Sequence, residues 1–335
     1  MRVPLEEDTM SKASRSETHT RLKIVTGQTS PKPELSAPEP FSSLVTVDLA
    51  GLSHPGLVRP DNQDHFLIVR GGRALETVCS NLAEVSPGVI FDETVYAMVI
   101  ADGLGGYAAG EVASRRAIYY LLSMVLHTPD WILRRGPTKG SEVMERMADR
   151  FRSVNAALLR EAAAQASLNG MSTTMTAAVT LGDDLIVTHV GDSRAYLYRG
   201  GALQRLTRDH SLADRLLREG VKAPTDRLSR ELRGILLQAL GAKDTLCKPE
   251  VNHFVLNDGD CLLLCTDGLT NQVDDSVIAD VLRKNMSAAD SCQALIDLSL
   301  KNGGLDNATV LIGRYSIPSR GHSPLYYTGP KRTHH

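Results

Sequence analysis

The sequence predicts an α+β fold whose sheets are largely antiparallel. Short apolar runs of strand length recur along the chain, and most are joined by tight polar turns such as Gly182-Asp183-Asp184, which are typical of β-hairpins. Helical patterns occur among them without the strict alternation of a parallel α/β sheet. In chain order, the expected strands cover residues 44–52, 64–69, 95–101, 175–181, 185–190, 195–198, 251–256, 261–265 and 308–315.

Apolar residues at helical spacing mark two long segments and a shorter pair before the last strand. The expected helices cover residues 108–126, 141–166, 279–285 and 291–301. The second helix has one apolar face, formed by residues that recur at three- and four-residue spacing: Val143, Met147, Phe151, Val154 and Leu158. Residues 211–242 are rich in charge and contain Pro224, so we expect an irregular, mobile excursion there.

The two ends of the chain lack the periodicity of helices and strands. Residues 1–44 are rich in Ser, Thr, Pro and Glu with few large apolar groups, so we expect a disordered N-terminal extension. Residues 318–335 carry Pro and Gly without a period and are expected to form a tail. Residues 45–317 would then form one domain, because 42% hydrophobic content is ample for a sizeable core.

Composition excludes several classes of function. A formal net charge of -2 and 4% aromatic residues supply neither the positive surface nor the stacking platforms of a nucleic-acid-binding protein. No stretch approaches the roughly 20 apolar residues of a membrane span, and the acidic N-terminus lacks the apolar region of a signal peptide. The five scattered cysteines suit a reducing compartment. We therefore expect a cytoplasmic protein that binds neither nucleic acid nor membrane.

Aspartates lie at the ends of several expected strands, next to a small or amide residue. Asp102-Gly103 and Asp267-Gly268 follow apolar runs, Asp306-Asn307 precedes the last strand, and Asp64 and Asp192 have similar positions. Each Asp-Gly pair taken singly is more often a turn than a ligand. Strand ends of two packed sheets can converge on one rim, however, and oxygen ligands without His or Cys select hard cations such as Mg²⁺ or Mn²⁺.

Short motifs around these aspartates occur in a characteristic order between about residues 45 and 316. They read Arg59-x-x-Asn62-Gln63-Asp64, Ala101-Asp102-Gly103-Leu104-Gly105-Gly106 with Gly110-Glu111, Met171-Ser172-Thr173-Thr174, Gly191-Asp192-Ser193-Arg194-Ala195-Tyr196, Thr207-Arg208-Asp209-His210-Ser211, Thr266-Asp267-Gly268-Leu269 and Asp306-Asn307-Ala308-Thr309. In these motifs and their order, the chain resembles the metal-dependent protein phosphatases of the PPM (protein phosphatase 2C) family, particularly its bacterial branch.

The resemblance implies a four-layer α/β/β/α fold, in which a central β-sandwich of two antiparallel sheets is flanked by helices. It also implies a site for two divalent cations, Mn²⁺ or Mg²⁺, at one end of the sandwich. Asp102 would bridge the two cations, and the carbonyl group of Gly103 would bind one of them. Asp267 and Asp306 would bind the other, with Asp64 acting on the metals nearby, partly through water.

The activity implied by the resemblance is that of a signalling phosphatase specific for phosphoserine and phosphothreonine in proteins. A water activated between the two metals would attack the phosphorus atom. The catalytic residues would be Arg59, Asp64 and Asp102, with Arg59 holding the phosphate through its planar fork. The supporting residues behind them would be Gln63, Asp192 and Asn307. The implied partners are phosphorylated proteins and a cognate Ser/Thr kinase, and we expect a monomer.

Some positions depart from the family pattern. Bacterial relatives bind a third metal through two aspartates, and Ser167 and Asn271 stand at these positions here. Because both changes remove charge, we expect the third metal to be absent or very weakly bound. Many relatives have a glutamate in place of Gln63. Residues 70–94 are longer than the turn of compact relatives, and form either a tolerated surface insertion or a docking element near the site.

Two other functions stay open at this point. One is a catalytically weak regulator that keeps the fold and binds phosphoproteins, and the other is a phosphatase of small phosphomonoesters. Retention of all four acidic residues Asp64, Asp102, Asp267 and Asp306 argues against the regulator. The sequence does not distinguish protein substrates from small ones.

Overall fold

The computed structural model describes residues 45–76, 90–104, 109–127, 140–221, 226–243 and 247–318. All of them belong to one compact unit, Ala37–His335. The disordered extension predicted over residues 1–44 lies outside the described residues, and so does the predicted tail except for Pro318.

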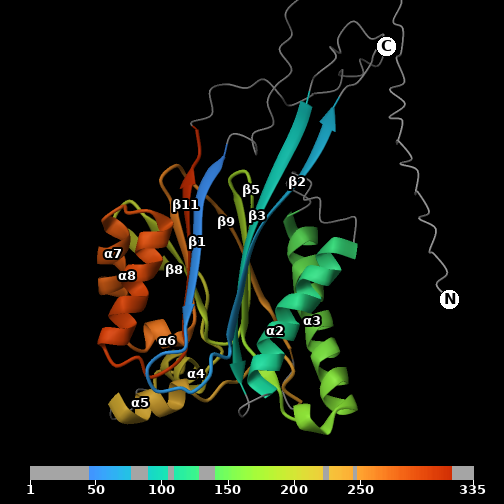
Figure 1. Cartoon of the computed structure of the whole chain (residues 1–335), viewed down its shortest axis with the longest axis vertical. Helices are drawn as coiled ribbons and strands as arrows, with labels where there is room; N and C mark the ends of the chain where they lie inside the picture. Colours follow the sequence, from blue (N-terminus) through green and yellow to red (C-terminus); the bar gives the residue numbers. More distant parts are fainter. Residues whose placement is uncertain are drawn as a thin grey trace, which may run out of the picture. The chain divides into compact units, whose positions relative to one another are not determined.

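The strands form two antiparallel sheets (Figure 1). The first sheet consists of β1 (Thr46–His54), β7 (Arg194–Arg199), β8 (Ala202–Arg205), β10 (Cys261–Cys265) and β11 (Ala308–Ser316). The second consists of β2 (Asp64–Glu76), β3 (Ile90–Leu104), β4 (Ser172–Thr173), β5 (Met175–Leu181), β6 (Asp184–Val190) and β9 (Glu250–Val255). The strand orders are β1-β11-β10-β7-β8 and β2-β3-β5-β6-β9, with β4 pairing with β3.

Helices cover the outer face of each sheet. On the second sheet lie α2 (Ala109–His127) and α3 (Gly140–Ala164), and on the first lie α7 (Asp275–Arg283) and α8 (Ala288–Lys301) (Figure 1). This four-layer α/β/β/α arrangement confirms the predicted fold class. Among the described helices, none is both long enough and apolar enough to cross a lipid bilayer.

Alternation of side chains along the central strands builds three apolar layers. In β10, Leu262 and Leu264 belong to the core between the two sheets, whereas Cys261, Leu263 and Cys265 face α7 and α8. Successive residues of a strand point to opposite faces, so a strand buried on both faces must be apolar throughout. The run Cys-Leu-Leu-Leu-Cys therefore specifies a central strand.

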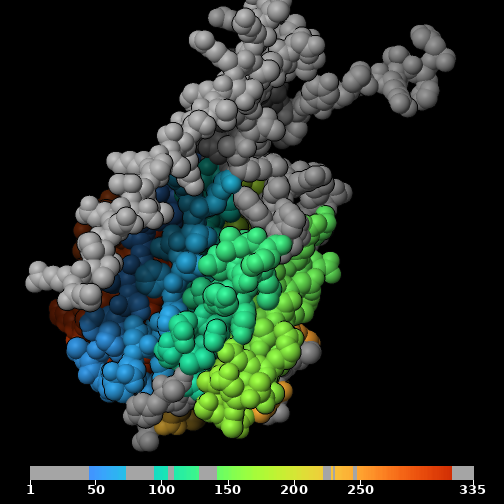
Figure 2. Space-filling view, turned by 45° about the vertical axis from the view of Figure 1, so that its right-hand side comes forward, coloured from blue at the N-terminus to red at the C-terminus, as the bar shows by residue number. Residues whose placement is uncertain are grey.

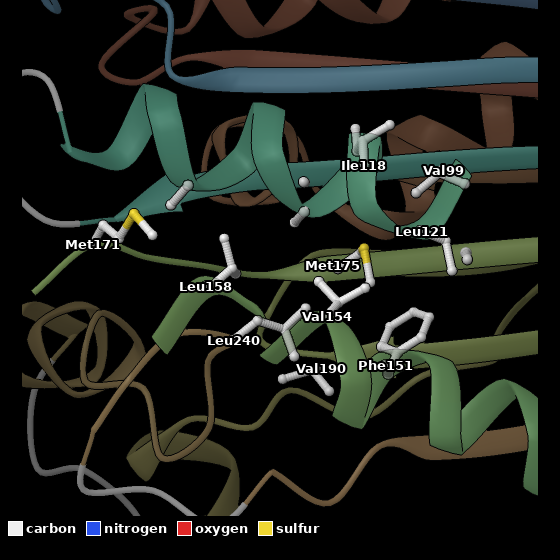
Figure 3. Close-up of a cluster of buried hydrophobic side chains, with 14 of the residues drawn as sticks. Val99, Ile118, Leu121, Phe151, Val154, Leu158, Met171, Met175, Val190 and Leu240 are labelled. Carbon is white, nitrogen blue, oxygen red and sulfur yellow. The ribbon is translucent and has the colours of Figure 1, made fainter. Parts of the chain in front are cut away.

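The third layer lies between the second sheet and α2 and α3. Figure 3 shows Val99 of β3 on one side of this layer and Phe151, Val154 and Leu158 of α3 on the other. These three helical residues are fully buried, so the predicted apolar face of α3 is confirmed. The space-filling view shows both helices packed over this sheet (Figure 2).

The segment 211–242 contains two short helices, α4 (Leu212–Arg218) and α5 (Asp226–Arg233), so the prediction of an irregular excursion was wrong. Ser211 caps α4, because its hydroxyl oxygen accepts a hydrogen bond from the backbone nitrogen of Asp214 at 3.3 Å. The ion pair between Arg218 and Asp214 is spaced four residues apart, as in stable surface helices. The high charge density that suggested irregular structure therefore supports the helix.

The hairpin of β2 and β3 is longer than predicted. Past the pair Val95–Leu181, where β5 ends, these two strands pair only with each other as far as Glu76 opposite Ile90. The other end of the hairpin is the pair Asp64–Asp102, about 40 Å away at about 3.3 Å per residue. The described ends of the insertion, residues 70–76 and 90–94, therefore lead away from the predicted site, and residues 77–89 lie outside the described residues.

Candidate active site

The aspartates singled out in the sequence gather at one end of the sandwich. Asp64, the first residue of β2, lies directly opposite Asp102 near the end of β3. Asp267 begins the short helix α6 (Asp267–Thr270), which follows β10, and Asp306 lies two residues before β11. The negative charges of these residues and of Asp192 all act on Asp102. Strand ends of both sheets thus converge on one acidic rim.

Loss of hydration and mutual repulsion raise the pKa values of these carboxyl groups. Burial, with a smaller contribution from neighbouring carboxylates, raises the pKa of Asp64 to about 7 and that of Asp267 to about 6. The pKa of Asp102 is raised well above its ordinary value, first by burial and then by Asp64 and Asp267. The pKa of Asp192 is raised too, by burial and then by Asp267. A nearby cation would relieve this repulsion.

Asp64 is the most deeply buried of these carboxylates, with 5% of its surface exposed. Its Oδ2 atom accepts hydrogen bonds from the hydroxyl groups of Thr266 at 2.9 Å and Thr309 at 2.7 Å. Its Oδ1 atom is buried without a hydrogen-bond partner. A buried carboxylate oxygen with open lone pairs, among other carboxylates, fits a hard divalent cation.

The two threonines were not identified from the sequence, although both lie inside motifs that were. Thr266 precedes Asp267, and Thr309 ends the motif that begins with Asp306. Thr266 also accepts a hydrogen bond from the backbone nitrogen of Thr309 at 2.9 Å. Their positions next to Asp267 and near Asp306 were the signal in the sequence that could have identified them as site residues. Their function is to fix the orientation of the Asp64 carboxylate.

The backbone of Asp102 is held by Thr173 and Thr174, which directly precede β5. Its nitrogen donates to the hydroxyl group of Thr174 at 3.0 Å, and its carbonyl oxygen accepts from the backbone nitrogen of Thr174 at 2.9 Å. The hydroxyl group of Thr173 donates to the same carbonyl oxygen at 2.7 Å. The next residue, Gly103, donates its N–H to the carbonyl group of Gln63 at 3.2 Å. The Asp102-Gly103 end of β3 is therefore fixed on both sides, by Gln63 and by Thr173 and Thr174.

Asn307 connects the start of β11 to the loop that carries Arg59. Its side-chain oxygen accepts from the backbone nitrogen of Gln63 at 2.9 Å. Its side-chain nitrogen donates to the carbonyl oxygens of Pro55 and Asp61, both at 2.8 Å. One amide thus satisfies three backbone groups of a single loop, the loop that carries Arg59.

Arg59 and Asp306 form a two-point ion pair. The Nε and Nη2 atoms of Arg59 donate to Oδ1 and Oδ2 of Asp306 at 2.9 and 2.6 Å. In the same way, the side-chain nitrogen of Asn271 donates to Oδ2 of Asp267 at 2.9 Å. Among the residues that the structure describes, no three acidic, His or Cys side chains already stand at metal-binding spacing. Two of the expected ligands are instead engaged by Arg59 and Asn271.

The remaining predicted residues contribute in different ways. Gln63 accepts a further hydrogen bond through its backbone, from the hydroxyl group of Ser114 to its carbonyl oxygen at 2.6 Å, and its side-chain oxygen lies close to Gly110. Asp192 is half-buried, and its charge acts on Asp102. Asn271 lies within the site through its bond to Asp267, whereas Ser167 is exposed on the short 3₁₀ turn Ala166–Leu168.

A fixed positive charge stands behind the acidic rim. The guanidinium group of Arg194 donates to Asp209 through Nε at 3.0 Å and Nη2 at 2.7 Å, and both side chains are nearly buried. Arg205 also pairs with Asp209. The charge of Arg194 lowers the pKa of Asp192 and of Asp267, and so partly opposes the repulsion within the rim. The sequence marks Arg194 only as part of the motif that contains Asp192.

The chain is similar in sequence to known protein phosphatases. Residues 88–301 match the family model described as protein phosphatase 2C. The serine/threonine phosphatase stp of Listeria welshimeri is 34% identical over 226 residues, which cover 67% of this chain and 86% of that protein. PstP of Mycobacterium tuberculosis is 34% identical over 225 residues, 66% of this chain and 41% of that protein.

Solved structures show the same likeness. The serine/threonine phosphatase of S. agalactiae superposes with a TM-score of 0.65 at 30% identity, over 80% of this chain and 99% of that chain. The catalytic domain of PstP in complex with two manganese ions gives a TM-score of 0.62 at 29% identity, over 81% of this chain and 99% of that one. Together with its fold and its ordered motifs, these matches show that the chain belongs to the protein phosphatase 2C family, as a bacterial-type PPM phosphatase.

Proposed function

We propose that the protein removes phosphate from phosphoserine and phosphothreonine residues of other proteins, using two divalent cations, Mn²⁺ or Mg²⁺. The observation that carries this function is the convergence of five carboxylates on the acidic rim, with the Oδ1 atom of Asp64 buried and unpaired. Support also comes from the serine/threonine phosphatases to which the chain is similar, one of which was solved with two manganese ions.

The donor atoms of the rim fit these cations. Carboxylate and carbonyl oxygens are the ligands that Mg²⁺ and Mn²⁺ prefer. Asp102, the Gly103 carbonyl group, Asp267 and Asp306 would hold the two cations, with Asp64 beside them. When bound, the cations supply positive charge for the phosphoryl oxygens and activate a water between them for attack on phosphorus.

The side chains around the two cations would then act on the substrate or hold the site in place. Arg59 binds the phosphoryl oxygens, since a guanidinium group matches two of them at once. Asn307 keeps the loop of Arg59 at a fixed place on the rim. Thr266 and Thr309 hold the Oδ2 atom of Asp64, which leaves its buried Oδ1 atom free of hydrogen bonds and available as a ligand.

Arg59 must release or share Asp306 in order to bind phosphate. Its side chain is 55% exposed and that of Asp306 36% exposed. An ion pair this accessible to water contributes little to stability, so it opens at low cost. The pair therefore holds the guanidinium group beside the acidic rim without fixing it there.

The cellular role proposed is that of a cytoplasmic signalling phosphatase. Its catalytic domain would span residues 45–317 and act as a monomer on phosphoproteins, in opposition to a cognate Ser/Thr kinase. Family membership supports the phosphoprotein substrate.

Hydrolysis of p-nitrophenyl phosphate and of a phosphothreonine peptide tests the proposed function. Both activities should require Mn²⁺, vanish in EDTA, and fall about a thousandfold in Asp102→Asn, since the loss of several kcal/mol of charge stabilisation is expected. The matched control is Asp297→Asn, which changes an exposed aspartate on α8 and should leave both rates unchanged. Turnover that survives EDTA, or that survives in Asp102→Asn, would falsify the metal-dependent mechanism.

A further inference from the structure

Three exposed apolar side chains border the ion pair of Arg59 and Asp306. Leu57 is 66% exposed, Val58 is 63% exposed and Leu305 is 51% exposed. Leu57 and Val58 directly precede Arg59, and Leu305 directly precedes Asp306. We refer to Leu57, Val58 and Leu305 as the apolar ledge.

The backbone that carries the ledge is held in place. The backbone nitrogen of Leu57 donates to the carbonyl oxygen of Gly304 at 2.7 Å. A Cβ atom on Gly304 would lie only 2.8 Å from the Cγ atom of Leu57, so the two segments are in close contact. Asn307 fixes the same loop through Pro55. The ledge is therefore a preformed surface, and binding on it requires little ordering of the chain.

Single exposed leucines are common on protein surfaces and need no explanation. The ledge differs because two segments about 250 residues apart in the chain bring three such residues together. The ledge also adjoins Arg59, the residue proposed to bind the substrate phosphate, because Arg59 directly follows Val58. The ledge is thus continuous with the place where the substrate phosphate is proposed to bind.

We propose that the ledge binds an apolar side chain that lies next to the phosphorylated residue of the substrate. The proposal rests on the proposed function, because it places the substrate phosphate on Arg59. An extended peptide advances at most about 3.3–3.6 Å per residue, so residues within two positions of the phosphorylated one lie within about 7 Å of it. Those residues fall within reach of Leu57, Val58 and Leu305.

The preferred substrate is therefore a phosphopeptide with a leucine, isoleucine or phenylalanine within two residues of its phosphoserine or phosphothreonine. An apolar side chain on an open ledge stays partly exposed to water, so it gains only part of the hydrophobic free energy that a closed pocket would give. We expect about a fivefold preference in kcat/KM over a peptide with glutamine at the same position. Because the ledge touches substrate and transition state alike, the preference should appear in KM and leave kcat unchanged.

Matched phosphothreonine peptides test the proposal, each with leucine or glutamine at one of the four flanking positions. The full-length protein with Mn²⁺ should favour leucine in at least one pair. The double variant Leu57→Asn, Leu305→Asn should lose that preference, and Val58→Thr, which keeps the side-chain volume, should weaken it. The control Leu126→Asn alters a residue that is 72% exposed near the end of α2, and should keep the preference.

The outcomes distinguish the ledge proposal from the proposed phosphatase function, because p-nitrophenyl phosphate has no flanking residues that the ledge could bind. Equal KM values for every peptide pair, alongside normal Mn²⁺-dependent turnover of p-nitrophenyl phosphate, overturn the ledge alone. An unchanged preference in the folded double variant does the same. Absence of Mn²⁺-dependent turnover with every substrate overturns the proposed function, and the ledge with it.

Discussion

Arg59 and Asp306 are paired side by side, with Nε–Oδ1 and Nη2–Oδ2 distances of 2.9 and 2.6 Å. The family pattern assigns the first residue to the phosphate and the second to a metal. If these assignments hold, a guanidinium group that rests on a metal-binding carboxylate would need only a change of side-chain conformation to reach the phosphate. This placement explains how an exposed arginine can be both available and positioned.

The first prediction concerns Arg59 itself. Arg59→Ala should lower kcat/KM for a phosphopeptide about 100-fold, because the phosphoryl group loses a two-point donor. The free energy of unfolding should change by less than about 1 kcal/mol, since the ion pair is exposed. Steady-state kinetics and urea unfolding measure the two effects. Arg283→Ala removes another exposed ion pair, with Asp280 on α7, and should alter neither.

The second prediction concerns metal binding and pH. The raised pKa values, about 7 for Asp64 and about 6 for Asp267, mean that the folded protein holds protons there that the unfolded chain has lost. In EDTA, these two groups therefore reduce stability as the pH rises from about 4 to about 7. Mn²⁺ competes with the same protons, so its stabilising effect should grow over that range.

Thermal unfolding in EDTA and in Mn²⁺ at several pH values measures this difference. At a concentration of 100 times its Kd, Mn²⁺ should add about 2.7 kcal/mol to the stability of the wild type. Asp102→Asn should lose most of that gain. A gain that does not depend on pH between 5 and 7 would contradict protonation of the rim.

The sequence predicted the strands of the sandwich well where the burial pattern was unambiguous. The strands at Met175–Leu181 and Cys261–Cys265 were predicted with their observed bounds, because each is a short apolar run between turn residues. The strand β8 was missed, although Gly200-Gly201 before it adopts the positive φ angles of a two-residue hairpin turn. Its residues Ala202–Arg205 lack an apolar run because the strand lies at the edge of its sheet.

The long hairpin of β2 and β3 could not be predicted from periodicity. A two-stranded ribbon that extends past its sheet has no third strand beside it, so its register is held by backbone pairing and its sequence need not alternate between apolar and polar residues. The candidate site shows the opposite case. Its aspartates were found from local motifs, but the bonds of Asp64 to Thr266 and Thr309 join residues 202 and 245 positions apart. Such pairs depend on how the two sheets pack.

The third prediction concerns the buried His189. Its Nδ1 atom lies 2.8 Å from the hydroxyl oxygen of Thr176, and its Nε2 atom lies 3.0 and 2.9 Å from the carbonyl oxygens of Gly191 and Arg208. Carbonyl groups only accept, so Nε2 carries the proton and Nδ1 accepts from Thr176. Burial, and after it the nearby His210, lowers the pKa of His189 to about 3.

Because the unfolded histidine has a pKa near 6.5, the neutral His189 contributes its full stability above that pH and loses it as the pH falls toward 3. At pH 5.5 the loss relative to pH 7.5 should be about 1.4 kcal/mol. His189→Gln keeps a side-chain donor and should abolish this part of the pH dependence in urea unfolding. His253→Gln, at an exposed histidine, should retain it.

The fourth prediction concerns the contact between Gly268 and Asn307. A Cβ atom on Gly268 would overlap the carbonyl oxygen of Asn307, which is backbone and cannot move aside. Gly268→Ala should therefore destabilise the protein by about 3 kcal/mol and reduce activity, because it displaces Asp267. Gly234→Ala is the matched control, since its nearest contact would be 3.7 Å away. Comparable stability of the two variants would show that α6 tolerates displacement.

The last prediction concerns the number of metals. Asn271 stands where bacterial relatives have an aspartate, and its amide nitrogen donates to Oδ2 of Asp267. An amide donor and an exposed Ser167 provide no carboxylate for a further cation. Isothermal titration should therefore give two Mn²⁺ per chain, and three at low millimolar Mn²⁺ would contradict this expectation. The double variant Ser167→Asp, Asn271→Asp should gain a third, weaker site, because it restores both carboxylates.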